Sequence, residues 1–520
     1  MNGAHVLIRT LVANGVDVCF SNPGTSEMQF VAALDDVPEM RAVLTLFEGV
    51  ATGAADGYGR MAERPAATLL HLGPGLGNGI ANLHNARRAG TPIVNIVGDH
   101  ATYHRQHDAP LTSDIETLAR NVSTWIRDTT RPDAVATDAV EAVHAAVGPP
   151  GSIATLILPA DVTWTDAGEP LGRVDPPTVA GVDENAVEQV VKVLHGGEPA
   201  ALLLGGRATR GRALATAARV AHQAGAKLLG EVFPARLERG AGLPPVERLG
   251  YFAEFATAQM HGLRHLVLVD APPPVSFFAY PDKPSVLVPD GCEVHVLAQR
   301  GDDVAAALEQ VADALGAAPD AYPRQPAGRP PRPSGELTAQ TLADAIGAVI
   351  PEGAIVVDEA QTGGLFVPGA TAGAPPHDWL TLTGGAIGQG LPAATGAAIA
   401  CPDRKVLCVE ADGSAMYTLQ ALWTQAREGL DVTTVLLDNR SYAILEIELA
   451  RVGAAAGGGG PRARSLLELT DPELDFVSLA RGMGVDATRP GSAEELTVAL
   501  ERALAEPGPH LIAVALPARL

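Results

Sequence analysis

The sequence contains few cysteines, few aromatic residues and few basic residues for its length. Of 520 residues, 4 are cysteine, 4% are aromatic, and Lys and Arg number 37 against 60 Asp and Glu. The cysteines form no CxxC pair and no zinc-ligand spacing, so no cysteine-based metal or redox motif is expected. Because the net charge is −23, we expect no nucleic-acid partner and no anionic membrane partner, since both need a basic face.

Long apolar runs are also missing. No stretch of about 18 apolar residues is present, as a membrane-spanning helix would require, and residues 1–20 lack the layout of a signal peptide. Hydrophobic residues make up 47% and charged residues 19% of the chain, which is typical of folded domains with large cores. We therefore expect a soluble, cytoplasmic protein.

Proline-rich polar segments divide the chain into three blocks. Residues 166–181 and 316–336 indicate extended connectors, because proline-dense segments build neither helices nor central strands. The predicted domains are 1–165, 182–315 and 337–520. Each block has the size of an ordinary domain.

Short, continuous apolar runs alternate with Ala-rich helical stretches in each block. Runs of this kind are typical of buried parallel strands. The strand candidates are 67–72, 92–97, 153–158, 200–204, 265–270, 354–358, 405–409 and 432–437. The predicted fold class is α/β, with three domains built on mostly parallel sheets. The string ATGAA occurs at 51–55 and again at 394–398, which favours a duplicated domain.

Polar residues follow two of the predicted strands in the last block. Asp412-Gly413-Ser414 comes after the strand at 405–409, and Asn439 comes after the strand at 432–437. Open parallel sheets bind ligands at this carboxyl edge, and oxygen ligands suit a Mg²⁺ ion that also binds phosphates. A helix cap at Asp412 and a simple turn at Asn439 are the alternative that spacing alone leaves open.

Glu48 begins a segment rich in small residues, EGVATGAADGYGRM (48–61). A carboxylate in such an apolar segment is costly unless it is paired or protonated. Glu48 is therefore a candidate functional residue. A Glu at a helix N-terminus, favoured by the helix dipole, is the alternative and the commoner case for a lone glutamate.

Together these motifs resemble the thiamine diphosphate (ThDP) enzymes of the acetolactate synthase, pyruvate decarboxylase and benzoylformate decarboxylase group. The string from Ala411 to Leu445 is similar to the family's GDG…N signature, with Ala411 in place of its first glycine. The segment after Glu48 is similar to the family's stretch ending in A-D-G-Y-A-R. The resemblance covers nearly the whole chain and implies a pyrimidine-binding, a middle and a diphosphate-binding domain, in that order.

The resemblance assigns roles to the polar residues of the last block. Asp412, Asn439 and the Ser441 carbonyl would hold Mg²⁺, which clamps the cofactor diphosphate, and the amides of Gly413 and Ser414 would lie at the same phosphates. Glu48 would contact N1′ of the aminopyrimidine and help to remove the proton from the thiazolium C2.

Two further segments resemble cofactor-binding loops of the family. In TGGAIGQG (383–390), the Gly385 carbonyl would accept from the 4′-amino group, and Ile387 would wedge the cofactor into its bent shape. In DEAQTGG (358–364), Gln361 and Thr362 would lie at the diphosphate. The glycines at 384–390 would equally serve a tight turn before a helix.

Candidate substrate residues come from a resemblance to benzoylformate decarboxylase. SNPGTSE (21–27) places Thr25 at its substrate-contacting serine, and LHLGPGLGN (70–78) places His71 at an active-site histidine. A histidine can move protons near neutral pH, although a structural hydrogen bond is the alternative for His71. The second active-site histidine of that enzyme has no counterpart at 273–284. His104 and His107 are further substrate candidates, or simply solvated residues.

The implied function is that of a ThDP- and Mg²⁺-dependent 2-oxo acid decarboxylase or carboligase, a lyase or transferase. The C2 ylide would attack a 2-oxo acid, CO₂ would leave, and the enamine would be protonated or joined to a second carbonyl. Because the family builds its site from two subunits, we expect a homodimer at least and a homotetramer as the complete assembly. The glycine-rich run at 453–461 predicts either a mobile cover of the site or a surface loop.

Two alternatives remain open. One is an acetolactate synthase, large-subunit-like, that joins two 2-oxo acids. The chain lacks that enzyme's A-F-Q-E stretch and the R-F-D-D-R stretch of its FAD-binding domain, which argues against FAD. The other is a non-catalytic, ThDP-binding regulatory subunit, which the presence of Glu48, Asp412 and Asn439 disfavours.

Overall fold

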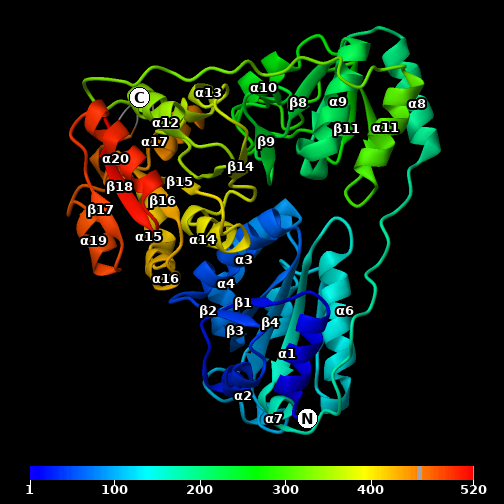
Figure 1. The fold of residues 1–520 in the computed structure, drawn as a ribbon, viewed down its shortest axis with the longest axis vertical. Helices are drawn as coiled ribbons and strands as arrows, with labels where there is room; N and C mark the ends of the chain where they lie inside the picture. Colours follow the sequence, from blue (N-terminus) through cyan, green and yellow to red (C-terminus); the bar gives the residue numbers. More distant parts are fainter. Residues whose placement is uncertain (454–458, 519–520) are drawn as a thin grey trace.

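The computed structural model describes residues 1–453 and 459–518, so part of the glycine-rich run at 453–461 lies outside the described residues. Three sheets, each flanked by helices, form the molecule (Figure 1). All neighbouring strands in them are parallel, apart from one antiparallel pair at the edge of the third sheet. The predicted α/β class is confirmed, and all eight strand candidates fall on strands.

The first sheet has six strands in the order β2-β1-β3-β4-β6-β5. These strands are β1 (Val18–Ser21), β2 (Arg41–Leu44), β3 (Ala66–His71), β4 (Ile93–Asp99), β5 (Trp125–Asp128) and β6 (Ile153–Pro159). Its helices are α1 (Gly3–Ala13), α2 (Met28–Ala33), α3 (Glu48–Ala62), α4 (Leu72–Ala89), α5 (Ile115–Ala119), α6 (Val135–Val147) and α7 (Ala160–Trp164). The central strands are buried along their whole length, as their continuous apolar sequence predicts.

The second sheet has five strands in the order β10-β8-β7-β11-β12. They are β7 (Ala200–Leu204), β8 (Lys227–Gly230), β10 (Glu247–Arg248), β11 (His265–Val269) and β12 (Glu293–Ala298). The helices here are α8 (Glu184–His195), α9 (Gly211–Ala224), α10 (Ala253–Gln259) and α11 (Val304–Ala314). The proline-rich connectors on either side form no helix or strand over 167–179 and 318–337.

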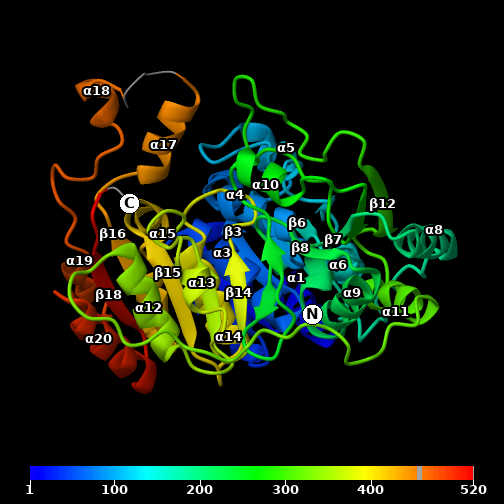
Figure 2. The same ribbon diagram turned by 90° about the horizontal axis from the view of Figure 1, so that it is seen from above.

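The third sheet has seven strands in the order β17-β18-β16-β15-β13-β14-β9. They are β9 (Leu237–Arg239), β13 (Ile355–Asp358), β14 (His377–Thr381), β15 (Val406–Ala411), β16 (Val432–Asp438), β17 (Asp486–Thr488) and β18 (His510–Ala515). Its helices are α12 (Ala339–Val349), α13 (Val367–Ala370), α14 (Gly390–Ala400), α15 (Asp412–Thr418), α16 (Ala421–Glu428), α17 (Ala443–Arg451), α18 (Pro461–Arg464), α19 (Phe476–Gly482) and α20 (Ala493–Ala505). Figure 2 shows α17 and α18 standing out from the rest of this unit.

One strand crosses the division that the sequence suggests. β9 comes from the middle block but pairs antiparallel with β14, with Leu237 opposite Trp379. The middle block is therefore attached to the third sheet by backbone hydrogen bonds as well as by the connector.

The first and third units meet where α3 packs against α14, at the centre of Figure 1. A Cβ added at Gly57 would lie 2.0 Å from the Ala393 carbonyl oxygen, and one added at Gly396 would lie 1.8 Å from that of Ala54. The helices therefore approach at backbone distance, which only glycine permits at these two positions. Both copies of ATGAA lie in this pair of helices.

Within the described residues, no helix combines the length and the apolar character that crossing a membrane requires.

Candidate active site

The residues predicted to bind the cofactor gather at the carboxyl edge of the third sheet. Because β16, β15, β13 and β14 are neighbours and parallel, the residues that follow each strand lie at one edge. In order along this edge, they are Asn439 and Ser441 after β16, Asp412, Gly413 and Ser414 after β15, Gln361 and Thr362 after β13, and Gly385 and Ile387 after β14.

Asp412 and Asn439 are brought together, as the sequence predicts. Asp412 is 2% exposed; its Oδ1 accepts from the Gly413 amide at 2.8 Å and its Oδ2 from the Arg440 amide at 2.6 Å. Arg440 adopts a positive φ of 57°, and this turn directs the backbone after β16 toward the carboxylate. The Asn439 Oδ1 accepts from the Ser441 amide at 3.0 Å.

In the part of the chain that the structure describes, neither Lys nor Arg forms an ion pair with the Asp412 carboxylate. Burial raises the pKa of Asp412 to about 6, and Asp438 adds to this effect, while hydrogen bonds from backbone amides oppose it. A buried carboxylate beside an amide oxygen and a backbone carbonyl is the kind of oxygen set that Mg²⁺ prefers. The residues therefore fit a Mg²⁺ ion.

The segment that carries Gly385 and Ile387 is held from both sides. The Asn85 Nδ2 donates to the Ala386 carbonyl at 2.8 Å, and the Asn82 Nδ2 donates to the Gly388 carbonyl at 3.1 Å. From the other side, Glu359 accepts from the Gly388 amide at 2.7 Å and also from the Gly390 amide. These contacts fix the backbone of the predicted aminopyrimidine-binding segment.

Glu359 and Glu410 form a buried pair of carboxyl groups beneath this segment. Glu359 is 2% exposed and Glu410 is 0% exposed. Burial raises the pKa of Glu359 to about 7, and burial together with the neighbouring Glu359 raises the pKa of Glu410 well above its usual value. Because backbone amides donate to Glu359, its carboxyl group ionises first, as the pH rises through about 7, while Glu410 keeps its proton.

Glu48 is the first residue of α3 and is 8% exposed. Its Oε2 accepts from the Asn78 Nδ2 at 3.0 Å. Asn82 donates to both the Gly49 carbonyl at 2.8 Å and the Gly388 carbonyl, so the start of α3 is tied to the segment at 384–388. Among the described residues, no hydrogen bond or ion pair joins Glu48 to Asp412 or Asn439.

His71 ends β3, and its Nδ1 lies 2.8 Å from Glu27 Oε2. Glu27 is 2% exposed; burial raises its pKa and the neighbouring His71 opposes that effect. The contact needs glycine at position 24, because a Cβ there would lie 2.3 Å from His71 Nδ1. Thr25 lies in the same turn as Glu27, after β1, and its side chain is exposed.

His104 and His107 are separate from this group. Both are exposed and lie after β4, with ring centroids 5.6 Å apart and ring planes tilted by 55° to each other. Among the described residues, neither forms a hydrogen bond or ion pair with His71 or Glu48.

A buried ion pair joins helix α3 of the first unit to the segment at 381–389 of the third unit. Asp56 and Arg60 lie one turn apart on α3 and pair with each other. The Arg60 side chain also donates to the Thr381 carbonyl at 2.7 Å and to Thr383 Oγ1 at 2.9 Å, and Asp56 accepts from the Gln389 Nε2 at 2.8 Å. The pair therefore anchors α3 to both ends of the segment at 381–389.

The sequence interpretation missed Glu27, Asn78, Glu359, Glu410 and the linking role of Asp56 and Arg60. Glu27 stands three residues after Gly24 and accepts from its amide at 2.7 Å, which is a capping pattern that the string GTSE could have indicated. The sequence indicated Glu410 more clearly, because it is the one charged residue in the otherwise apolar strand β15.

Comparison with known proteins identifies the family. Residues 1–118 match the sequence model of the thiamine pyrophosphate enzyme N-terminal TPP binding domain, and residues 369–514 match that of the C-terminal TPP binding domain. The chain is 60% identical to the "Putative acetolactate synthase large subunit IlvX" of Mycobacterium tuberculosis, over 99% of both chains. It is 30% identical to the benzoylformate decarboxylase of Pseudomonas aeruginosa, over 96% of both.

Solved structures share the fold. A ThDP-dependent 4-hydroxybenzoylformate decarboxylase of Rhodococcus jostii superposes with a TM-score of 0.86 at 24% identity, over 99% of both chains. The benzoylformate decarboxylase of Polynucleobacter necessarius gives 0.84 at 23% identity, over 100% of this chain and 99% of that one. The chain belongs to the thiamine pyrophosphate (thiamine diphosphate) enzyme family. It is a ThDP-dependent enzyme of the acetolactate synthase and benzoylformate decarboxylase type.

Proposed function

We propose that the chain is a ThDP- and Mg²⁺-dependent decarboxylase or carboligase acting on a 2-oxo acid, with a substrate pocket similar to that of benzoylformate decarboxylase. The observation that carries the proposal is the buried pair Asp412 and Asn439. The same chain also has a buried glutamate, Glu48, at the start of α3. A regulatory subunit without catalysis has no physical need for both.

The residues of the third sheet would hold the cofactor. Asp412, Asn439 and the Ser441 carbonyl would coordinate Mg²⁺, and Gly413, Ser414, Gln361 and Thr362 would lie at the diphosphate. The Gly385 carbonyl and Ile387 would orient the aminopyrimidine, since their segment is fixed by Asn82, Asn85 and Glu359. When bound, ThDP supplies the nucleophilic carbon and the electron sink for decarboxylation.

The first sheet would supply the acid–base groups. Glu48 would exchange a proton with the aminopyrimidine ring, and Asn78 would orient its carboxylate. His71, held by Glu27, would move protons at the substrate. Thr25, in the turn that carries Glu27, and the exposed His104 and His107 are further candidates for substrate contact.

The domain division and the assembly form part of the proposal. The unit at 1–165 would bind the pyrimidine, and the unit at 337–520 would bind the diphosphate. The unit at 182–315 would connect the two. Exposed apolar side chains follow the predicted cofactor residues: Leu365, Phe366, Met416, Tyr417, Leu445 and Ile447. A surface of this kind is typical of an interface. It supports a homodimer, at least, in which a second copy completes the site, with a homotetramer as the expected full assembly.

The experiment is an NMR assay of the full chain with ThDP and Mg²⁺, using ¹³C-labelled pyruvate and benzoylformate in parallel. Aldehyde and CO₂ from benzoylformate support the proposed pocket. Acetolactate from pyruvate would replace it with the synthase function. If neither acid reacts and calorimetry shows no ThDP binding, the chain is not a catalyst of this kind.

A further inference from the structure

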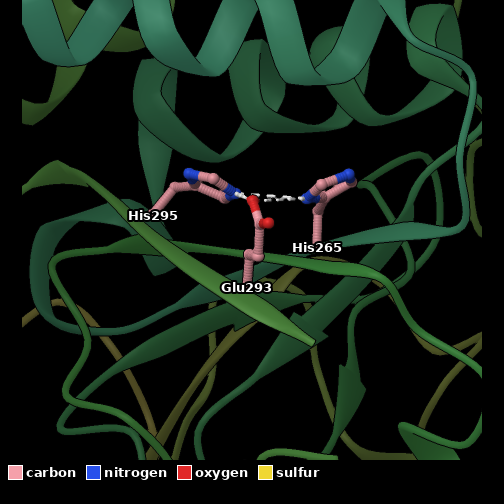
Figure 3. Close-up of side chains that lie close together, drawn as sticks. All are labelled: His265, Glu293 and His295. Atoms are coloured by element: carbon pink, nitrogen blue, oxygen red, sulfur yellow. Dashed lines mark hydrogen bonds and ion pairs between the residues drawn. The ribbon is translucent and has the colours of Figure 1, made fainter. Parts of the chain in front are cut away.

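A cluster of two histidines and a carboxylate lies on the middle sheet, in a different sheet from the candidate active site. β11 and β12 are adjacent and parallel, with His265 opposite Glu293 and Val267 opposite His295. Residues two apart on a strand point to the same face, so this register places all three side chains together. Figure 3 shows both imidazole rings directed toward each other, with the Glu293 carboxylate between them.

The distances in the cluster suit a metal ion. His265 Nδ1 and His295 Nε2 are 3.2 Å apart, and Glu293 Oε2 lies 3.9 Å from the first and 3.8 Å from the second. A tetrahedral Zn²⁺ ion with bonds of about 2.0–2.1 Å holds its ligand atoms about 3.3 Å apart. The two nitrogens already have this spacing, and the Glu293 side chain, which is 72% exposed, is free to move closer.

A hydrogen bond between the two rings does not account for the whole cluster. An N–H···N bond would explain the 3.2 Å separation of the nitrogens. The Glu293 oxygen, however, is too far from either nitrogen for a hydrogen bond, yet nearly equidistant from both. That is the position expected of a third ligand around a shared cation.

A second carboxylate orients His265. Its outer nitrogen, Nε2, lies 3.2 Å from Glu198 Oε2. A carboxylate that accepts from the outer N–H leaves the lone pair of the inner nitrogen directed into the cluster, as is usual for histidine ligands of zinc.

The chain's second histidine and carboxylate cluster lacks these properties. Asp486, Glu506 and His510 also lie close together. There, Arg502 forms ion pairs with both carboxylates and would compete with a metal ion for them. Neither Lys nor Arg occupies the corresponding place beside Glu293 among the described residues.

We propose that His265, Glu293 and His295 form a binding site for a divalent transition-metal ion, with Zn²⁺ as the representative ion and water in the remaining position. Two imidazole nitrogens and one carboxylate oxygen suit Zn²⁺, Ni²⁺ or Cu²⁺ rather than Mg²⁺ or Ca²⁺. The ion would join the edge strand β12 to β11 and stabilise the middle unit.

The test is equilibrium dialysis of the chelator-treated full chain against Zn²⁺, with ThDP and excess Mg²⁺ present to occupy the active site. The wild type is expected to retain one Zn²⁺ per chain, and Co²⁺ in its place should give the visible absorption of a tetrahedral site. His265→Asn should lose this ion. Glu198→Gln, which removes only the orienting carboxylate, should weaken binding about 10- to 100-fold.

Glu293→Gln keeps the proposal testable if His265→Asn fails to fold, because Glu293 is exposed and its replacement leaves the strand intact. It should weaken Zn²⁺ binding at least about tenfold, while His261→Asn, an exposed histidine of the same unit, should bind as the wild type does. Equal Zn²⁺ binding by the wild type and Glu293→Gln, or no Zn²⁺ retained by the wild type, would overturn the proposal.

Discussion

His71 and Glu27 form a hydrogen-bonded pair, with 2.8 Å between Nδ1 and Oε2. The two residues are 44 positions apart in sequence and meet because β1 and β3 are adjacent, parallel strands. The carboxylate fixes which ring nitrogen carries the proton, and it leaves Nε2 free to act on a substrate.

We expect His71→Ala to slow turnover by about 10²- to 10⁴-fold, the usual contribution of a general acid or base. Glu27→Gln should slow it less, by about 10- to 150-fold, because it weakens one hydrogen bond to a charged group, worth about 1.5–3 kcal/mol. Steady-state kinetics of both variants and of the double variant provide the test. If the two residues act as a unit, the double variant will be no slower than His71→Ala. Losses of turnover that multiply in the double variant would contradict this. The exposed Glu39→Gln serves as the control.

Asp412→Asn should weaken ThDP binding at least about tenfold in the presence of Mg²⁺. The amide keeps the shape of the side chain but removes the negative charge that the ion requires. Calorimetric titration with ThDP, with and without Mg²⁺, measures the effect. The exposed Asp403→Asn is the control, and equal ThDP affinity in both variants would argue against a metal at Asp412.

Arg60→Ala should destabilise the chain by about 3–5 kcal/mol, because it leaves the Asp56 carboxylate buried without its cation. Arg120 offers a matched comparison: it also pairs with a carboxylate one helical turn away, Glu116, but both side chains are exposed. Thermal unfolding of the two variants measures the difference. We expect a large drop in the unfolding midpoint for Arg60→Ala and no measurable drop for Arg120→Ala; similar midpoints would contradict the proposed anchor.

The Glu359 and Glu410 pair should make stability depend on pH. Burial raises the pKa of Glu359 to about 7, from an ordinary value of 4.5. A folded-state pKa above the unfolded one means that the stabilisation is fully present below about pH 4.5 and is lost as the pH rises through 7, by about 1.4 kcal/mol per pH unit in that window. Cys408, which faces Glu410, stays a neutral thiol because burial raises its pKa well above the usual value.

Glu410→Gln should reduce the loss of stability between pH 5 and pH 8. Burial and the neighbouring Glu359 raise the pKa of Glu410 as well, so unfolding in this range releases a proton from Glu410, and the amide has none to release. Chemical unfolding at both pH values, for the wild type, Glu410→Gln and the exposed Glu352→Gln, gives the comparison. The same pH dependence in all three proteins would show that the pair does not share a proton.

The strands with continuous apolar sequence, and the residues that directly follow them, were predictable because they depend on local patterns. Each of the eight apolar runs chosen as a strand candidate lies on a strand, and the position of Asp412 and Asn439 directly after two of them predicted their meeting; other strands, such as β1, β14 and β18, were not among the candidates. In a parallel sheet the carboxyl ends of neighbouring strands lie at the same edge, so these predictions needed no knowledge of the tertiary structure.

Residues that act across the fold were not predictable in the same way. The role of Glu27 comes from its hydrogen bond to His71. Arg60 and Asp56 form hydrogen bonds with Thr381 and Gln389, respectively, which are more than 300 positions away in sequence. β9 joins the third sheet although its sequence lies in the middle block. Such pairings depend on which elements pack together, and the sequence of each element alone does not specify that.

Glu48→Gln tests the central claim most directly. Glutamine has the same shape and can keep a contact with Asn78, but it cannot exchange the proton that activates the cofactor. With the 2-oxo acid that the wild type converts, we expect turnover to fall by at least about 10²-fold, with unchanged ThDP binding and an unchanged thermal unfolding midpoint. Turnover within a few-fold of the wild type would contradict the account.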